Sequence, residues 1–322
     1  MSQLTEKLAA AKTVAIMGHI RPDGDCIGSC LALYNYIREQ YPSVDATVYL
    51  EKPADKFDYL QGFGDICSDF EEDRAYDLCV CLDCSDRARF GSFVKYLDSA
   101  ADSLCIDHHI TNLNFAAVNV VEASASSTCE VLFEQLEAEK VNKAVAECLY
   151  TGIIHDTGVF KFSSTSAKTM RIAGFLMEKG IDFTSIIDDS FYTKTYIQNQ
   201  VLGRALLESV TFMDGRCIFS VVRKQDMEFY GVESKDLDGI IDQLRITRGV
   251  ECAIFLYEVG IHEYKVSLRS NTNLDVSRIA SYFGGGGHVK AAGCTMSGSI
   301  HDVINNLSSH IEEQMKQENE NV

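Results

Sequence analysis

The chain has 322 residues, of which 46% are hydrophobic and 24% are charged. This balance, at a length that suits two domains, excludes a disordered chain, and no apolar run reaches the roughly 20 residues of a membrane span. The formal net charge of −18 disfavours a partner such as long duplex nucleic acid, but not a small phosphorylated ligand held by a few cations. We expect a cytoplasmic protein, because the first residues lack the pattern of a signal peptide.

The first part of the chain alternates short apolar runs with segments of helical spacing. This alternation indicates an α/β domain whose mainly parallel sheet is flanked by helices. Strands are expected at 13–17, 46–50, 78–82 and 103–106, and a first helix at 27–37. Helices dominate from residue 127 to 209, and Ser127 and Glu130 have the spacing of a capping box where this stretch begins.

After residue 209 the pattern becomes that of a smaller α+β domain. Asp214 and Gly215 separate two apolar runs, which signals a hairpin, and a second strand pair follows. The expected elements are strands at 210–213, 217–222, 252–258 and 264–268, a helix at 275–282 and a C-terminal helix from about residue 300. We expect a first domain at 1–190, a helical linker at 191–209 and a second domain at 210–322.

The twelve cysteines lie mostly inside apolar runs, which favours reduced, buried thiols over a disulfide framework. Cys79, Cys81 and Cys84 crowd one segment. No second Cys/His pair lies at zinc-finger spacing, so we do not expect zinc there.

The densest chemical signal is residues 18–29 (GHIRPDGDCIGS), where the first strand ends and the first helix begins. In an open α/β sheet this edge binds ligands. His19, Asp23 and Asp25 suit divalent cations, and we expect the two aspartates to lie in an extended loop and to point to different ions. The alternative is a turn whose aspartates cap the helix.

Three more positions repeat this placement at the ends of elements. Asp83 follows one strand, Asp107-His108-His109 follows the next, and Asp156 ends an apolar helical stretch. Each has an ordinary reading as a turn, core or cap residue. Together, these carboxylates and imidazoles predict a site for two divalent cations, with Mn²⁺ favoured and Mg²⁺ or Fe²⁺ as alternatives. Two cations roughly 3.5–4 Å apart can drive in-line displacement at phosphorus, so the residues predict a two-metal phosphoesterase.

The order of these motifs resembles the DHH–DHHA1 phosphoesterase family, and within it the short NrnA-like nanoRNase and pAp phosphatase group. The first motif is matched by His19, Asp23 and Asp25, the second by Asp83, the name-giving triad by residues 107–109 and the fourth by Asp156. Residues 267–271 (SLRSN) and 284–288 (GGGGH) match the DHHA1 substrate-binding motifs. The resemblance covers nearly the whole chain.

The resemblance also implies a role for each matched residue. One metal would be held by His19, Asp23 and Asp83. The other would be held by Asp25, Asp83, His108 and Asp156, with Asp83 bridging. The catalytic set would be Asp83, Asp107, His108 and His109, with Asp107 and His109 orienting His108 or meeting the phosphate. The substrate-binding set would be Arg269, Ser270, Asn271, Gly285, Gly286, Gly287 and His288.

In the second domain, Arg269 is the expected fork for a terminal phosphate. The glycine run fits a backbone that approaches a ligand closely, although many surface loops are glycine-rich without one. His155 is expected to be packed or to face solvent. No role is assigned to Arg245, Arg248 or Arg278.

The resemblance implies an enzyme that hydrolyses very short oligoribonucleotides, the 3′-phosphate of adenosine 3′,5′-bisphosphate (pAp), or both. The alternative is a phosphodiesterase for cyclic dinucleotides or their linear products, because stand-alone members share this layout. The glycine run counts against a DHH-type pyrophosphatase, and the length and negative charge against a RecJ-type exonuclease. A silent nucleotide sensor would be expected to lack a ligand, and all six are present. A homodimer is expected from the resemblance alone.

Overall fold

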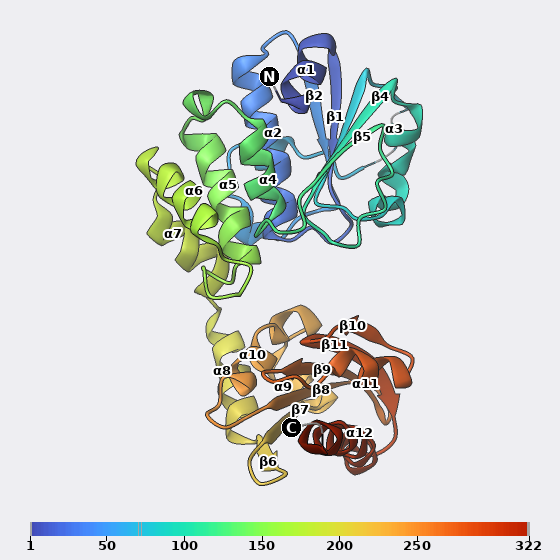
Figure 1. The fold of residues 1–322 in the computed structure, drawn as a ribbon. Coiled ribbons are helices and arrows are strands. Elements are labelled where there is room, and N and C mark those ends of the chain that lie inside the picture. The colour runs from blue at the N-terminus through green and yellow to red at the C-terminus, as the bar shows by residue number, and fades with distance from the viewer. Residues whose placement is uncertain (1, 70, 72, 321–322) are drawn as a thin grey trace. The chain divides into compact units, whose positions relative to one another are not determined.

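The computed structural model describes residues 2–69, 71 and 73–320, which form two compact units, 1–193 and 194–322 (Figure 1). Each unit contains one β-sheet, of five strands in the first unit and six in the second. The α/β class expected from the sequence is confirmed. No described helix combines the length and the apolar character needed to cross a membrane.

The first unit is an all-parallel sheet with helices on both faces. Its strands pair in the order β2-β1-β3-β4-β5. The strands are β1 (Thr13–Met17), β2 (Asp45–Tyr49), β3 (Leu78–Leu82), β4 (Asp102–Asp107) and β5 (Val118–Val121). The helices are α1 (Gln3–Ala10), α2 (Gly24–Gln40), α3 (Val94–Ser99), α4 (Thr128–Gln135), α5 (Lys143–Asp156), α6 (Ala167–Glu178) and α7 (Phe183–Ile187).

Burial on both faces of the sheet explains the apolar runs that predicted its strands. Val14 and Ile16 of β1 pack into a core with α2 and α5, whereas Ala15 and Met17 pack into a second core with α3. Strands buried on both faces need apolar residues at every position, as in β1 and β3. The edge strand β5 is only half-buried, which is why its sequence carried no such signal.

The strand order places the site. The chain winds from β1 to β2 on one side and then crosses to β3 on the other side of β1. Ligands of open α/β sheets bind beside the carboxyl ends of the strands at such a switch point. The carboxyl ends of β1 and β3 carry His19 and Asp83, so the topology brings these two motifs together.

The second unit is a mixed sheet with a core on each face. Its strand order is β10-β11-β9-β8-β7-β6, in which only β7 and β8 are parallel. The strands are β6 (Val210–Phe212), β7 (Cys217–Val222), β8 (Cys252–Gly260), β9 (Glu263–Ser270), β10 (Gly286–His288) and β11 (Ala291–Ser297). The helices are α8 (Tyr196–Leu207), α9 (Lys224–Tyr230), α10 (Ile240–Arg245), α11 (Val276–Tyr282) and α12 (Ile300–Glu320).

The predicted hairpin at Asp214-Gly215 and the β8–β9 pair are confirmed. The strand at the end of the glycine run, β10, was not predicted. All twelve cysteines are free and only Cys67 is not buried, as expected. The Sγ atoms of Cys79 and Cys81 lie 3.9 Å apart inside the core.

Two glycines let α2 and α5 pack closely beneath the site. A Cβ atom at Gly28 would lie 2.5 Å from the carbonyl oxygen of Cys148. One at Gly152 would lie 2.3 Å from the Sγ atom of Cys129 and 2.6 Å from Oδ1 of Asp25. All three distances are shorter than carbon contacts allow, so these two positions require glycine.

We therefore expect Gly152→Ala to lower the free energy of unfolding by about 1–3 kcal/mol, because the core and Asp25 must move. The matched control is Gly174→Ala in α6, where an added Cβ meets nothing within 4 Å. It should raise stability by up to about 1 kcal/mol. Urea unfolding followed by circular dichroism measures both, and a Gly152→Ala protein as stable as the wild type would contradict the close packing.

Candidate active site

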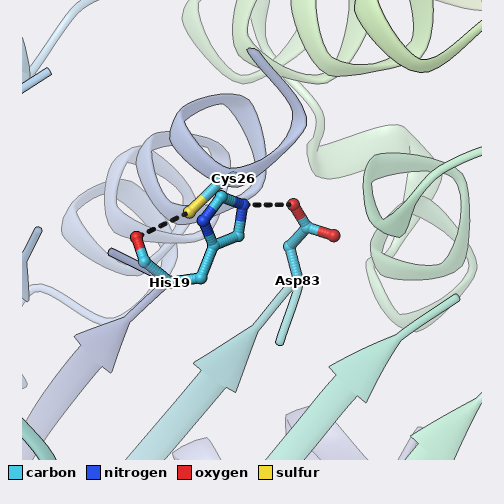
Figure 2. A group of neighbouring side chains, drawn as sticks. All are labelled: His19, Cys26 and Asp83. Atoms are coloured by element: carbon cyan, nitrogen blue, oxygen red, sulfur yellow. Dashed lines mark hydrogen bonds and ion pairs between the residues drawn. The ribbon is translucent and has the colours of Figure 1, made fainter. Parts of the chain in front are cut away.

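His19 is buried and presents one ring nitrogen to two carboxylates. Its Nδ1–H donates to the carbonyl oxygen of Ile20 at 2.8 Å, because a carbonyl can only accept. The other nitrogen, Nε2, lies 3.4 Å from Oδ2 of Asp83 (Figure 2). It also lies 3.7 Å from Oδ2 of Asp23. The backbone bond thus fixes the tautomer whose Nε2 can bind a cation.

The two aspartates of the first motif lie at the start of α2. Asp23 is the N-cap, and its Oδ1 accepts hydrogen bonds from the backbone N–H groups of Asp25 and Cys26 at 3.2 and 3.1 Å. Asp25 lies in the first helical turn, so the expectation of an extended loop for both residues is wrong. Asp23 has an exposed side chain with Oδ2 toward His19, whereas Asp25 is completely buried.

Asp83 is held in a left-handed backbone conformation, with φ of 54°. This conformation is uncommon for residues other than glycine and is found at functional sites. Its Oδ2 faces His19, while its Oδ1 lies 3.6 Å from Nδ1 of His109 and 3.9 Å from Nε2 of His108. The two oxygens of one carboxylate therefore face two different groups of imidazoles.

Within residues 107–109, the three side chains have different environments. Asp107 is fully buried, and its Oδ1 accepts from the backbone of His108 at 2.8 Å and from Nδ1 of His109 at 2.7 Å. Its Oδ2 accepts from Asn112 at 2.6 Å. These hydrogen bonds suit Asp107 to orienting the histidines. His108 instead points its Nε2 at Oδ2 of Asp156, 3.0 Å away.

The site holds a surplus of buried negative charge. Burial raises the pKa of Asp25, and the charges of Asp83 and Asp156 raise it further. Burial also raises the pKa of Asp156. For His108, burial opposes the charged form, but the hydrogen bond to Asp156 and the charges of Asp25 and Asp83 raise its pKa to about 10. Neighbouring carboxylates thus contribute both to the raised pKa of the two aspartates and to the raised pKa of His108.

These side chains fit a divalent metal centre. Ligand atoms of three groups lie within 4.8 Å of one another: His19, Cys26 and Asp83; Asp83, His108 and His109; and Asp25, His108 and Asp156. Asp83 belongs to the first and second groups, and His108 belongs to the second and third. Cations neutralise the repulsion between the carboxylates, and this mixture of oxygen and imidazole ligands suits Mn²⁺ or Mg²⁺ better than a thiolate-loving metal.

Cys26 was not singled out from the sequence as a site residue, although it lies beside His19 in Figure 2. Its Sγ–H donates toward the carbonyl oxygen of His19 at 3.9 Å. Burial raises the pKa of this thiol, so it stays protonated, whereas a metal ligand would be the thiolate.

His155 is packed, which is one of the two arrangements expected for it. Its ring lies against Phe57 and Phe191, with centroid distances of 5.1 and 5.4 Å, and its Nε2 lies 3.1 Å from Oγ of Ser190. Burial lowers its pKa to about 4, so it is neutral at pH 7. It does not join the three groups of ligand atoms.

In the second unit, Arg269 and His288 share one face of the sheet. Arg269 of β9 pairs with Ala291 of β11, which pairs with His288 of β10. Directly paired residues point to the same side of a sheet. Arg269 and Asp242 also line a pocket of about 350 Å³. Oδ1 of Asp242 lies 3.7 Å from Nε of Arg269 and 3.5 Å from Nε of Arg245.

Ser270 and Asn271 bond to neighbouring backbone. Oγ of Ser270 donates to the carbonyl oxygen of Thr272 at 3.0 Å. Nδ2 of Asn271 donates to the carbonyl oxygens of Arg245 and Val250 at 2.7 and 2.9 Å, which holds the turn after α10 against the end of β9. Arg248 and Arg278 are exposed.

Gly284 of the glycine run has a left-handed φ of 74°, and two further positions have a packing reason for glycine. A Cβ atom at Gly285 would lie 2.2 Å from the carbonyl oxygen of Gly293, and one at Gly287 would lie 2.5 Å from that of Ala291. Close pairing with β11 therefore requires glycine there. An added Cβ at Gly286 meets nothing within 4 Å, so packing does not explain this glycine.

Comparison with known proteins finds one family model in each of the two units. Residues 13–153 match the N-terminal domain of the DHH family, and residues 214–317 match the DHHA1 domain. Two proteins named bifunctional oligoribonuclease and PAP phosphatase NrnA, from Bacillus subtilis and Thermus thermophilus, are 25% and 29% identical. Each alignment covers 92% of this chain, and 93% and 89% of the relatives. An exopolyphosphatase-related protein from Bacteroides fragilis has a TM-score of 0.86 at 25% identity, over 96% of this chain and 94% of its own.

Binding of Mn²⁺ is expected to release protons at neutral pH. His108 keeps its proton up to its pKa of about 10, and a ligand must be deprotonated. Because each bound cation displaces about one proton from His108 at any pH well below 10, Mn²⁺ affinity should increase by up to about tenfold per pH unit between roughly pH 6 and 8. Calorimetric titration in two buffers of different ionisation enthalpy measures the released protons.

His301→Ala is the control for that titration, because His301 is an exposed residue of α12 in the second unit. It should leave proton release unchanged. Mn²⁺ affinity that did not depend on pH would contradict the protonation state of His108.

Proposed function

Because the chain belongs to the DHH family and carries a DHHA1 domain, we propose that it is a two-metal phosphoesterase of very short oligoribonucleotides and of the 3′-phosphate of pAp. The observation that carries this proposal is Asp83, whose Oδ2 faces His19 and whose Oδ1 faces His108 and His109. A carboxylate in this position can bridge two cations. The names of the relatives from two bacteria support the substrate class.

One cation would be held by His19, Asp23 and Asp83. The other would be held by Asp25, Asp83, His108 and Asp156, and Mn²⁺ is favoured over Mg²⁺ and Fe²⁺ by the mixture of carboxylate and imidazole ligands. When bound, two such cations supply a nucleophile from water at neutral pH and neutralise the charge on the attacking and leaving oxygens.

The protein's own proton donor is His109. Its Nδ1–H donates to Asp107, and this hydrogen bond raises the pKa of His109. The ring is partly exposed, so its Nε2 could present a proton to a bound substrate. This proton would pass to the leaving oxygen, while Asp107 keeps the ring oriented.

The second unit would bind the rest of the substrate. Arg269 and His288 project from one sheet face, which suits a phosphate and its nucleoside. Packing does not explain why residue 286 is glycine. Its lack of a side chain would leave the backbone open to a phosphate. The proposal thus places catalysis in residues 1–190 and substrate binding in residues 210–322, joined by 191–209. The net charge of −18 agrees with short substrates.

The test is product release with Mn²⁺ from a matched set: pAp, a linear diadenylate, a pentanucleotide, a long RNA, cyclic di-AMP and pyrophosphate. We expect pAp and the shortest linear RNAs to be preferred, because an acidic protein offers few unpaired basic side chains to hold the phosphates of a long RNA. Comparable cleavage of cyclic di-AMP would instead assign the chain to the cyclic dinucleotide enzymes.

Asp83→Ala is the negative control for every substrate in that set, because it removes a ligand shared by both cations. Product release by this variant at the wild-type rate would refute the two-metal assignment.

Arg269→Ala should raise KM for pAp by about ten- to a hundredfold, since a charge-assisted hydrogen bond is lost, and should leave Mn²⁺ binding unchanged. Arg278→Ala, which removes an exposed arginine of the same unit, is the matched control and should change KM little. Steady-state kinetics and a parallel Mn²⁺ titration distinguish the two effects. Loss of Mn²⁺ binding in Arg269→Ala would show that the substrate clamp is misassigned.

A further inference from the structure

Thr128 is the first residue of α4 and bonds to two of the metal-site carboxylates. Its backbone N–H donates to Oδ2 of Asp25 at 2.6 Å, and its Oγ1–H donates to Oδ1 of Asp83 at 3.0 Å. Thr128 is fully buried, as Asp25 is, and Asp83 is 2% exposed. These two carboxylates come from α2 and from the end of β3, so one residue of a third element joins them.

The start of α4 is itself held rigidly. Ser127 is the N-cap, and its Oγ accepts from the backbone of Glu130 at 3.1 Å. The carboxylate of Glu130 does not complete the predicted capping box by reaching the backbone of Ser127. Instead its Oε2 accepts from the hydroxyl groups of Ser126 and Thr169, both at 2.6 Å, which anchors this turn to the start of α6.

The backbone N–H groups of this turn hold Asp25 in one orientation. Cys129 donates to Oδ1 at 3.0 Å while Thr128 donates to Oδ2, so each oxygen has one fixed donor. The positive end of the helix also offsets part of the charge of a carboxylate that has lost all contact with water. These two hydrogen bonds belong to the backbone and survive any substitution of the Thr128 side chain.

The hydroxyl group is different, because only the side chain supplies it. It donates a hydrogen bond to one lone pair of Asp83 Oδ1, and this bond limits rotation of the carboxylate. Oδ2 is then kept toward His19 and the rest of Oδ1 toward His108 and His109. We propose that the Thr128 hydroxyl is a positioning group that sets the orientation in which Asp83 bridges the two metal sites.

This inference rests on the proposed function, and its test separates the hydroxyl from the methyl group. Thr128→Val keeps a side chain of the same shape and removes the hydroxyl, whereas Thr128→Ser keeps the hydroxyl and removes the methyl. If the hydroxyl positions Asp83, the valine variant should bind Mn²⁺ about ten- to a hundredfold more weakly and lose a similar factor in kcat/KM for pAp. The serine variant should stay within a few-fold of the wild type in both. If Thr128 only fills space, serine should be the more damaging change.

Thr151→Val is the matched control. It removes another fully buried hydroxyl of the first unit, which donates to the carbonyl oxygen of Glu147 at 2.8 Å. Circular dichroism and thermal unfolding of the metal-free proteins show whether each variant folds. Mn²⁺ affinity is read from the electron paramagnetic resonance signal of free Mn²⁺, which does not depend on turnover.

Three outcomes are decisive. A folded Thr128→Val protein with weakened Mn²⁺ binding, beside a normal Thr128→Ser protein, supports the inference. Wild-type Mn²⁺ binding in Thr128→Val, or a valine variant that cannot fold while the serine variant is also impaired, overturns it. If the wild type binds Mn²⁺ but hydrolyses neither pAp nor short RNA, the proposed function fails, while the Mn²⁺ titrations still decide the role of Thr128.

Discussion

The mutual repulsion of buried carboxylates is the constraint on which the rest of this structure depends. Asp25, Asp83 and Asp156 belong to groups of ligand atoms that lie within 4.8 Å, and Asp25 has no exposed surface. Such an arrangement is costly unless fixed donors and a cation offset the charge. The N–H groups of α4 and the imidazoles of His19 and His108 supply part of this compensation. Burial and neighbouring charges raise the pKa of Asp25 and Asp156, and the hydrogen bond to Asp156 raises that of His108, so these groups tend to hold protons that a bound cation could replace.

A parallel sheet is well suited to building such a site from distant parts of the chain. The carboxyl ends of parallel strands meet at one edge, so residues that follow β1, β3 and β4 become neighbours although they are far apart in sequence. Helices then close the site from one side, because α2 starts with Asp23 and Asp25, α5 ends with Asp156, and α4 begins against Asp25. The glycines at positions 28 and 152 are part of the same design, since they let α2 and α5 come close enough for their ends to converge.

The sequence predicted the features that depend on local pattern. It missed those that depend on which way backbone and side-chain groups face after the helices pack. The strands β1, buried from Val14 onward, and β3, buried throughout, were found at their observed residues, because burial on both faces requires apolar runs. The half-buried edge strand β5 and the short helices α9 and α10 carry no such pattern and were missed. Residues 107–109 and Asp156 stood out because polar residues directly follow apolar elements. The capping spacing at Ser127 predicted where α4 begins, but not that its first N–H groups would face Asp25 or that Glu130 would bond to Ser126. Those facts depend on the packing of three helices, which one segment of sequence does not encode.

A matched motif does not mean that each of its residues acts on the substrate. In the second unit, Asn271 bonds to the backbone of the turn after α10, and Gly285 and Gly287 are glycine because β10 lies against β11. Arg269, Gly286 and the exposed His288 are the members of these motifs for which packing gives less of a reason. Such a segment combines residues that build a surface with residues that use it, and sequence similarity gives both the same weight. The contacts of each side chain distinguish them. The same reasoning separates Asp107, whose oxygens accept from His108, His109 and Asn112, from Asp83, whose Oδ2 faces His19 and whose Oδ1 faces His108.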